Sequence, residues 1–283
     1  EKEYKNKVVE YMVDEYQQGR TPNPDIMCNQ EVKFKLFLET SLEQGADMIA
    51  TGHYAQVEHS QESNAPSVHA RLFMAKDSNK DQTYFLYRIT EKALQKTLFP
   101  LGNFTKPEVR QMAKDRNLFT AVKKESMGIC FVGQIGIRDF LSQYVQISPG
   151  NVIDIESKKV LGQHDGAIFY TLGQRHGLNI GGGLPYYVVS KDMAKNEVYV
   201  SQNINDQHIW KRTFSVTNVH YINEQQSSKL NDITVRIRHR AALIGCEIND
   251  ETLELSESQR AITPGQSVVF YQGNECIGGA VVA

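Results

Sequence analysis

Cysteine is scarce in this sequence of 283 residues, which has four: Cys28, Cys130, Cys246 and Cys276. No two of them form a Cys-x-x-Cys pair, and four in so long a chain do not build a disulfide framework. Their spacing also fits no common zinc site, so we expect no metal site. We therefore expect a protein of a reducing compartment, with a cytoplasmic location.

Long apolar runs are absent as well. No run approaches the ~20 residues that span a bilayer, and the start, Glu1-Lys2-Glu3-Tyr4-Lys5, has no apolar signal core. We therefore expect neither membrane insertion nor secretion. Neither sign of charge dominates, because 31 Lys and Arg oppose 33 Asp and Glu for a net charge of −2. This balance argues against a wholly basic protein that coats nucleic acid, although it allows local basic patches.

The first half of the chain has the pattern of an α/β domain. Residues 1–18 and 29–44 predict helices, the second with Val32, Phe37, Leu38 and Leu42 inward and Gly45 as its stop. Residues 46–50 predict a short buried strand, followed by the polar turn Thr51-Gly52-His53-Tyr54. A polar turn after a buried strand is where α/β nucleotide-binding domains place their ligand loops.

Three further segments complete the first half. The polar stretch His59–His69 predicts a surface loop. Residues 91–97 and 106–117 predict helices, and Thr105 is the expected N-cap of the second, with Pro107 in its first turn.

The second half changes to short β-type runs separated by turn residues. These runs are Asn151–Ile155, Ala167–Tyr170, Tyr186–Ser190, Glu197–Val200, Phe214–Tyr221, Ile233–His239, Ser267–Tyr271 and Cys276–Val282. We therefore expect an all-β second half, arranged as two small barrels divided near 202–208.

The segment Asp25-x-x-Cys28 predicts a site for thiol chemistry at the start of a helix. The positive end of the helix dipole favours a thiolate, and Asp25 can accept or relay a proton. The alternative is that Asp25 only caps the helix and Cys28 is a small buried residue. Cys130 follows Lys123 and Lys124 and a glycine-containing turn, which suits a nucleophile of low pKa. The alternative there is a cysteine at a strand edge beside two solvated lysines.

Three other polar segments are candidate contacts for a nucleotide or nucleic acid. The turn 51–54 can approach a nucleotide through its glycine backbone, and the turn 78–82 can hold phosphates or a base edge. Arg236, Arg238 and Arg240 alternate on a β-type run and therefore share one face, which would suit a phosphate backbone. The alternatives are a structural histidine, a solvated loop and a solvated edge strand.

Several motifs occur in a fixed order along the chain. They are Thr21-Pro22-Asn23-Pro24-Asp25-x-x-Cys28-Asn29, Ala50-Thr51-Gly52-His53-Tyr54, Asp77-Ser78-Asn79-Lys80-Asp81-Gln82-x-Tyr84-Phe85-Leu86, Gly128-Ile129-Cys130-Phe131 and Thr171-Leu172-Gly173-Gln174-Arg175-x-Gly177-Leu178. The series closely resembles the bacterial tRNA-specific 2-thiouridylases, which place sulfur on the wobble uridine of tRNAs for Lys, Glu and Gln. The resemblance runs from about Val8 to the C-terminus.

The resemblance implies an α/β Rossmann-like ATP-pyrophosphatase domain followed by two small β-barrel domains. The expected bounds are 1–138, 139–203 and 204–283, with tRNA bound by the last domain. The family's Ser-Gly-Gly-Val-Asp-Ser loop, which binds ATP phosphates, does not occur in this sequence. We expect that the N-terminal part of the first domain is missing, either truly or only from this numbering, and that this chain alone cannot adenylate uridine.

The resemblance also implies a mechanism and its residues. ATP, with Mg²⁺, would activate the uridine C2 oxygen as an adenylate. Cys130 would carry a persulfide whose terminal sulfur either attacks C2 directly or is released to do so. Cys28 would attack the persulfide and free sulfide, and the resulting Cys28–Cys130 disulfide would be reduced again. Asp25 would be the general acid/base, and Asn23 and Pro24 would shape the pocket for a flipped uridine. Gly52 would lie against ATP, and the expected tRNA contacts are His53, Lys80, Asp81, Gln82, Arg238, His239 and Gln266.

The expected partners are the anticodon stem-loop of the Lys, Glu and Gln tRNAs and a sulfur-relay protein or cysteine desulfurase that donates the persulfide sulfur. Two competing functions remain open. Another ATP-pyrophosphatase ligase, of the argininosuccinate or GMP synthetase kind, would not need the cysteine pair. An RNA-binding module that has lost catalysis would keep the barrels.

Overall fold

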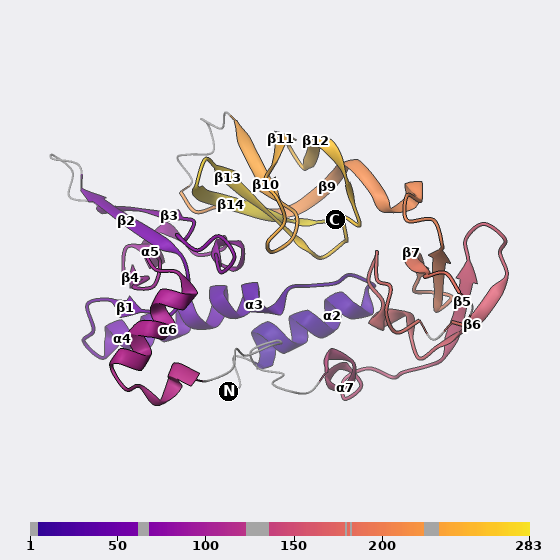
Figure 1. The fold of residues 1–283 in the computed structure, drawn as a ribbon, viewed down its shortest axis with the longest axis horizontal. Coiled ribbons are helices and arrows are strands. Elements are labelled where there is room, and N and C mark those ends of the chain that lie inside the picture. The colour runs from indigo at the N-terminus through magenta and orange to yellow at the C-terminus, as the bar shows by residue number, and fades with distance from the viewer. Residues whose placement is uncertain (1–4, 62–67, 123–135, 179, 182, 224–231) are drawn as a thin grey trace.

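The computed structural model describes residues 5–61, 68–122, 136–178, 180–181, 183–223 and 232–283 (Figure 1). Figure 1 shows three parts: a mainly helical first part, a closed barrel formed by the last part of the chain, and a smaller sheet between them in sequence. This α/β part followed by two β parts confirms the predicted fold class.

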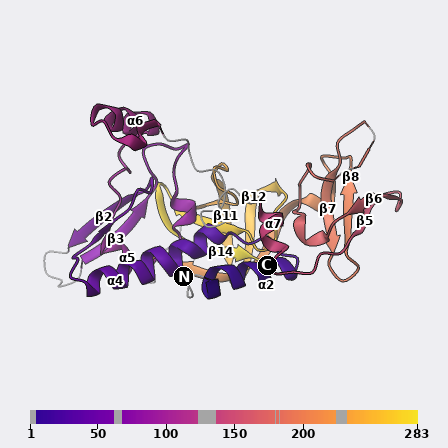
Figure 2. The same cartoon turned by 90° about the horizontal axis from the view of Figure 1, so that it is seen from below.

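Two helical stretches form the base of the first part. The first consists of η1 (Lys5–Glu10) and α2 (Tyr11–Gln17), and the second of α3 (Pro24–Met27), η2 (Cys28–Phe37) and α4 (Leu38–Glu43). Both predicted helices are therefore confirmed, although the second begins earlier than expected. Figure 2 shows the second stretch running along one side of the molecule beneath the hairpin and barrel.

The inward face of the second helix differs from the prediction at one position. Phe37 was expected inside but is 55% exposed, whereas Phe34 is 4% exposed and joins the core. Residues Cys28–Phe37 are π-helical. A π-turn bonds residues five apart rather than four, so it rotates the buried face away from the α-helical period on which the prediction rested.

The first part contains two small pieces of sheet. Strands β1 (Ile49–Ala50) and β4 (Thr97–Leu98) pair in parallel, so the predicted strand 46–50 is confirmed only at its end. Strands β2 (Gln56–Gln61) and β3 (Val68–Phe73) form an antiparallel hairpin. The prediction of a surface loop over His59–His69 is therefore wrong at both ends, where residues 59–61 and 68–69 belong to strands, while residues 62–67 lie outside the described part of the chain. The segment is polar, and the hairpin is held by a partner more than 200 residues away: β3 pairs with β14 at Leu72↔Cys276 and Phe73↔Glu275.

Short helices complete this part. They are η3 (Thr83–Phe85), α5 (Glu91–Leu94), α6 (Lys106–Asp115), η4 (Phe119–Val122) and α7 (Ile137–Leu141). The predicted start of α6 is confirmed, because Thr105 and Glu108 form a capping box in which each side chain accepts a backbone N–H of the other residue. None of the residues of α6 is buried, and the helix projects from one end of the molecule (Figure 2).

The middle part is a four-stranded sheet with the order β6-β5-β8-β7. Its strands are β5 (Gly150–Asp154), β6 (Val160–His164), β7 (Tyr187–Asp192) and β8 (Glu197–Ser201). The predicted strand Ala167–Tyr170 is wrong, because Ala167–Phe169 is a 3₁₀ turn, η5. Ala167 and Tyr170 are buried in the core of this sheet, and so short an apolar run does not distinguish a strand from a buried turn.

The last part is a six-stranded barrel that follows η6 (Gln207–Ile209). Its strands are β9 (Trp210–Tyr221), β10 (Ile233–Arg236), β11 (Ile244–Asn249), β12 (Thr252–Arg260), β13 (Ser267–Gln272) and β14 (Glu275–Val282). The order β13-β10-β11-β12-β9-β14 closes through a pairing between β13 and β14. The hairpin β2–β3 extends the same sheet beyond β14.

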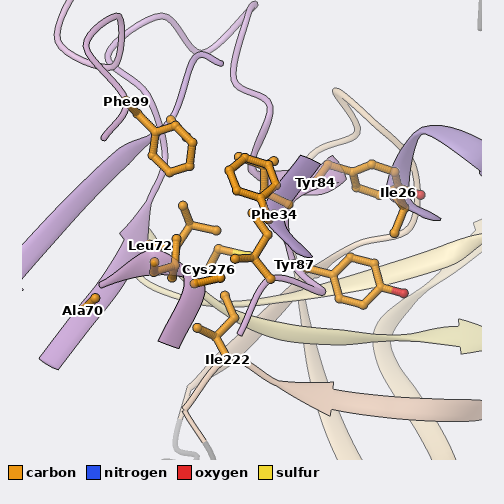
Figure 3. Close-up of a cluster of buried hydrophobic side chains, with 14 of the residues drawn as sticks. Ile26, Phe34, Ala70, Leu72, Tyr84, Tyr87, Phe99, Ile222 and Cys276 are labelled. Carbon is orange, nitrogen blue, oxygen red and sulfur yellow. The ribbon is translucent and has the colours of Figure 1, made fainter. Parts of the chain in front are cut away.

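The first part and the barrel share one hydrophobic core. Figure 3 shows Ile26 and Phe34 of the second helix meeting Tyr84 and Tyr87, together with Cys276 of β14. The helix that carries the Asp25-x-x-Cys28 motif is therefore fixed against the barrel by apolar packing, which holds the two parts in one arrangement.

Candidate functional site

The candidate nucleophile Cys28 lies in the first turns of a buried helix. Asn23 has extended backbone angles, φ −111° and ψ 95°, and Pro24 occupies the first helical position, for which its fixed φ is suited. Asp25 is half-buried and Cys28 is 5% exposed. Residues three apart on a helix share a face, so the carboxylate and the thiol belong to one side of it.

The helix dipole acts on Cys28 less directly than the sequence suggested. We expected the thiol at the helix start, but the helix begins at Pro24, and Cys28 is therefore more than one turn inside it. The field of the dipole falls off within the first turn. Asp25, in that turn, has the position closest to the backbone N–H groups of the helix start.

Asn29 links the helix to the barrel. Its side chain is buried, and its Nδ2 donates to the carbonyl oxygen of Phe85 at 2.9 Å. The ring of Phe85 packs against the imidazole of His239, with 4.6 Å between ring centroids. The residue that follows Cys28 is thus one hydrogen bond and one ring contact away from the turn after β10, which carries His239.

Asp81 and Arg236 form a buried ion pair. The Asp81 side chain, 2% exposed, accepts hydrogen bonds from Ala75 N (3.0 Å) and Thr83 Oγ1 (2.8 Å). Its Oδ2 also accepts from Arg236 Nη1 at 2.8 Å. Arg236 lies over the ring of Tyr271, 5.2 Å from its centroid. The pair ties the polar turn of the first part to strand β10.

The expected face of three arginines is therefore wrong. Strand β10 ends at Arg236, and Arg236 turns inward because Asp81 offers a buried carboxylate there. Arg238 and Arg240 follow the strand and are exposed, and Arg240 has a positive φ of 64°. Strand alternation does not apply to residues beyond the strand.

A smaller cluster of three cations remains at this place around His239, and we define this cationic cluster as Lys80, Arg238 and Arg240. Arg238 is exposed and its Nη2 donates to the carbonyl oxygen of Arg260 at 2.6 Å. Burial, followed by the charge of Arg240, lowers the pKa of His239 below its ordinary value. Its imidazole is accordingly neutral near pH 7. Lys80 is among the charges that act on His239, which places the polar turn and the end of β10 together.

The predicted nucleotide turn joins this region through Gln82. Its Oε1 accepts from the backbone N of Tyr54 at 2.9 Å, and its own backbone N donates to the carbonyl oxygen of Tyr54 at 2.8 Å. Gly52 is exposed, and a Cβ added to it would meet only Leu101 Cδ1, at 3.9 Å. The backbone at Gly52 is therefore open to the close approach of a ligand.

The side chain of His53 is enclosed by neighbouring residues, which leaves little of it for a direct contact with tRNA. Its Nδ1 and Thr51 Oγ1 are 2.8 Å apart, and its ring lies 5.6 Å from that of Phe34 and 6.2 Å from that of Phe99. Burial, assisted by the charge of Lys33, lowers the pKa of His53 to about 4. The imidazole is neutral near pH 7 and packs in an aromatic cluster, tilted by 49° against Phe34 and edge-on to Phe99.

Gln266 reaches the motif loop. Its Nε2 donates to the carbonyl oxygen of Thr21 at 2.7 Å, and the backbone N of Thr21 donates to the carbonyl oxygen of Pro264 at 2.8 Å. The turn before β13 is thereby fixed to the segment that leads into Asn23 and Pro24.

Cys130, together with Lys123 and Lys124, lies outside the described residues. Two other thiols are within them: burial raises the pKa of Cys246 in β11 to about 12 and raises that of Cys276 in β14 well above its ordinary value. Both therefore remain protonated at neutral pH, as expected of barrel core residues.

The described parts of the chain contain neither a candidate metal site nor a candidate membrane span. No three His, Cys, Asp or Glu residues there are grouped so that they could hold a metal ion. None of the described helices is both long enough and apolar enough to cross a membrane.

The sequence predicted no role for Asn29 or Thr171, which organise this region, and predicted a wrong one for Arg236. Asn29 and Thr171 stand inside recognisable motifs, but nothing in their local sequence indicates which distant group each one contacts. Arg236 was placed on the wrong face. The sequence offers a clue only for Asn29: an amide side chain directly after the candidate nucleophile can anchor the helix that carries Cys28.

Known protein families match the chain along nearly its whole length. Residues 1–134 match the tRNA methyl transferase HUP domain, residues 138–202 the tRNA methyl transferase PRC-barrel domain, and residues 211–282 the aminomethyltransferase beta-barrel domain. A tRNA-specific 2-thiouridylase MnmA of Bacillus cytotoxicus is 45% identical over 288 residues, covering 100% of this chain and 76% of the relative. Proteins of the same name are 44% identical in Limosilactobacillus reuteri, of which the chain covers 77%, and in Streptococcus sanguinis, of which it covers 76%.

Proposed function

The chain belongs to the tRNA-specific 2-thiouridylase family, and we propose that it transfers sulfur to C2 of the wobble uridine in tRNAs for Lys, Glu and Gln. One observation carries this proposal beyond the family. The helix of Asp25 and Cys28 is joined through Asn29 and Phe85 to the end of β10, so a site for thiol chemistry adjoins a cationic cluster. Such clusters bind nucleic-acid phosphates.

ATP supplies the activation of the C2 oxygen, whose departure as part of AMP makes the substitution feasible. The loop at Gly52 fits a nucleotide, because its backbone is exposed and follows strand β1. Mg²⁺ would then be held mainly by the phosphates, as is usual for this ion.

Cys28 and Cys130 divide the sulfur chemistry between them. The Cys28 thiolate attacks the inner sulfur of a persulfide on Cys130, and the terminal sulfur leaves as hydrosulfide. That sulfide attacks C2 of the uridine, and the Cys28–Cys130 disulfide is returned to two thiols by an external thiol reductant. The persulfide sulfur comes from a sulfur-relay protein or a cysteine desulfurase.

The tRNA contacts divide into direct and indirect ones. Lys80, Arg238 and His239 are accessible and cationic or polar, which supports direct contact with the anticodon stem-loop. Asp81 is paired with Arg236, His53 packs against the rings of Phe34 and Phe99, and Gln266 donates to Thr21. We infer that these three hold the contact surface in place, whereas Asn23 and Pro24 shape the pocket for the uridine.

A direct assay tests the proposed function. The intact enzyme is incubated with tRNA, ATP and a persulfide donor, and the digested tRNA is analysed by mass spectrometry together with AMP. We expect 2-thiouridine and AMP in equal amounts. Bound but unmodified tRNA would leave an RNA-binding module, and a methylated uridine would favour the activity in the names of the matching family models.

We predict that Asp25→Asn lowers the rate of thiolation at saturating tRNA by about 10²–10⁴-fold, the usual contribution of a general acid/base. The affinity for tRNA should stay within about two-fold, because an amide of the same shape keeps the helix start and removes only the proton transfer. Single-turnover kinetics and a filter-binding titration measure the two quantities. Asp14→Asn on α2, an exposed carboxylate, is the control. An unchanged rate for Asp25→Asn would remove Asp25 from the chemistry.

We predict that Arg238→Ala weakens the binding of every cognate tRNA by a similar factor and flattens the salt dependence of binding. Each phosphate contact adds about 0.7–0.9 to the slope of log K against log salt, and a phosphate contact does not read sequence. Arg212→Ala is a matched control, because Arg212 also donates to a backbone carbonyl of the barrel. If affinity and slope match those of the control, Arg238 is only a solvated residue.

A further inference from the structure

Thr21, the first residue of the Thr-Pro-Asn-Pro-Asp segment, contacts all three parts of the molecule. It belongs to the first part and is 9% exposed. Its backbone N donates to Pro264 O at 2.8 Å, and its carbonyl oxygen accepts from Gln266 Nε2 at 2.7 Å, both in the barrel. Its hydroxyl lies 3.2 Å from that of Thr171, in the middle part. All three polar groups of this residue are thus used between parts of the chain.

The contact is too close to slide. Gly265 has a φ of +87°, and a Cβ there would stand 2.8 Å from Thr21 N, a distance that a real Cβ does not reach, and 3.1 Å from Thr21 C, which is tighter than an ordinary contact. A Cβ on Gly173 would likewise stand 2.8 Å from the Cβ of Ala261, so the middle part and the barrel also meet beside this point. Close packing at Thr21 therefore fixes the position of the three parts relative to one another.

A displacement at Thr21 passes directly to the reactive residues. Only Pro22 and Asn23 separate it from the helix start at Pro24. Each proline fixes its own φ and restricts the residue before it, so this linker is stiff. The N-cap Asn23 makes no side-chain capping hydrogen bond. The position of Asp25 and Cys28 at this end of the helix accordingly depends on how Thr21 is held.

We propose that Thr21 is a positioning residue for sulfur transfer, held by Thr171 and Gln266, and that it makes the placement of Asp25 and Cys28 depend on the docking of both β parts. The proposal rests on the proposed function, because the reaction that Thr21 serves is that transfer. The role of Thr21 adds to the proposed function a residue that sets the geometry of Asp25 and Cys28. It assigns Thr21 no contact with tRNA or ATP.

The test measures the exposure of the Cys28 thiol and therefore requires no thiolation activity. Thr21→Val keeps the shape of the side chain and removes its hydroxyl, and Thr171→Val does the same for the partner. Each single change leaves one hydroxyl without its partner, the buried one of Thr21 or the half-buried one of Thr171, whereas the double change removes both. We expect iodoacetamide to label Cys28 about five- to ten-fold faster in each single variant, and less than additively in the double variant. Peptide mapping separates Cys28 from the other thiols.

Three further variants complete the experiment. Thr21→Ser keeps the hydroxyl and should label at the wild-type rate. Gly265→Ala should label faster than wild type, because its Cβ forces the barrel turn off Thr21. Thr217→Val, an exposed threonine of β9, is the control and should change nothing. Wild-type labelling in both Thr21→Val and Gly265→Ala overturns the proposal.

Kinetics separate positioning from a general structural role. In the intact enzyme, Thr21→Val should lower kcat about five- to ten-fold with KM for tRNA within about two-fold. A raised KM with unchanged kcat overturns the proposal, because the contact would then serve only tRNA binding. If even the wild-type protein makes no 2-thiouridine, the proposed function fails, while the labelling result still decides the role of Thr21.

Discussion

Cys28→Ser is expected to lower the rate of thiolation by on the order of 10³-fold or more, with tRNA affinity within about two-fold of wild type. A serine hydroxyl fits the same space inside the helix and can bond to a carbonyl of the preceding turn, so the fold is kept. It is not ionised near pH 7 and does not attack a persulfide. The persulfide on Cys130 should therefore persist, and mass spectrometry of the Cys130 peptide after one turnover should detect it.

Cys246→Ser is the matched control for this change. Cys246 lies in β11, and burial raises its pKa to about 12, so its thiol takes no part in chemistry near pH 7. Thiolation at the wild-type rate by Cys246→Ser and its loss in Cys28→Ser would assign the attack to Cys28. Normal 2-thiouridine formation by Cys28→Ser would contradict the assignment, and so would a persulfide that disappears at the wild-type rate.

Asp81→Asn is expected to lower the free energy of unfolding by about 3–5 kcal/mol, because it leaves the buried guanidinium of Arg236 without its counter-charge. The amide keeps the shape of the carboxylate and can still accept from Ala75 N, so the loss is mainly electrostatic. Urea unfolding followed by circular dichroism measures the change. The same variant should weaken tRNA binding, since the pair holds Lys80 and the end of β10 together.

An exposed ion pair supplies the comparison. Arg212 Nη2 and Glu254 Oε1 are 3.1 Å apart, and roughly half of each side chain is exposed. Glu254→Gln should therefore lower the free energy of unfolding by no more than about 1 kcal/mol. Adding Arg236→Met to Asp81→Asn removes the buried charge and should restore much of the lost stability. A loss for Asp81→Asn as small as that for Glu254→Gln would contradict the role assigned to the pair.

Capping and helix-stopping residues in the sequence predicted most of the helix ends at which they occur. Helix α6 was predicted from Thr105 and Pro107, and the end of α4 from Gly45, because caps and stops act through neighbouring backbone groups. The hairpin β2–β3 has no such marker. It depends on its pairing with β14 at the far end of the sequence, and no window of neighbouring residues contains that information.

The same distinction applies to the candidate site. The segment from Asn23 to Cys28 was recognisable because its residues are neighbours in the sequence and carry the signals of a helix start. The orientation of Arg236 was not, since the same alternation would place it outside if Asp81 were absent. Thr171 and Thr21 are 150 residues apart, and only the closed arrangement of three parts brings their hydroxyls together.

The pairing of β3 with β14 has a consequence for where the molecule can be divided. The shared core and the shared sheet make the hairpin and the barrel one cooperative unit of unfolding, although they lie at opposite ends of the sequence. A barrel expressed alone would lose the partner of β14 at Glu275 and Cys276 and would expose the buried side chain of Cys276 together with the barrel's share of the common core, and such newly exposed apolar surface promotes association between chains. Dividing the chain near residue 210, at the boundary between the matched family models, therefore separates the barrel from the hairpin with which it folds.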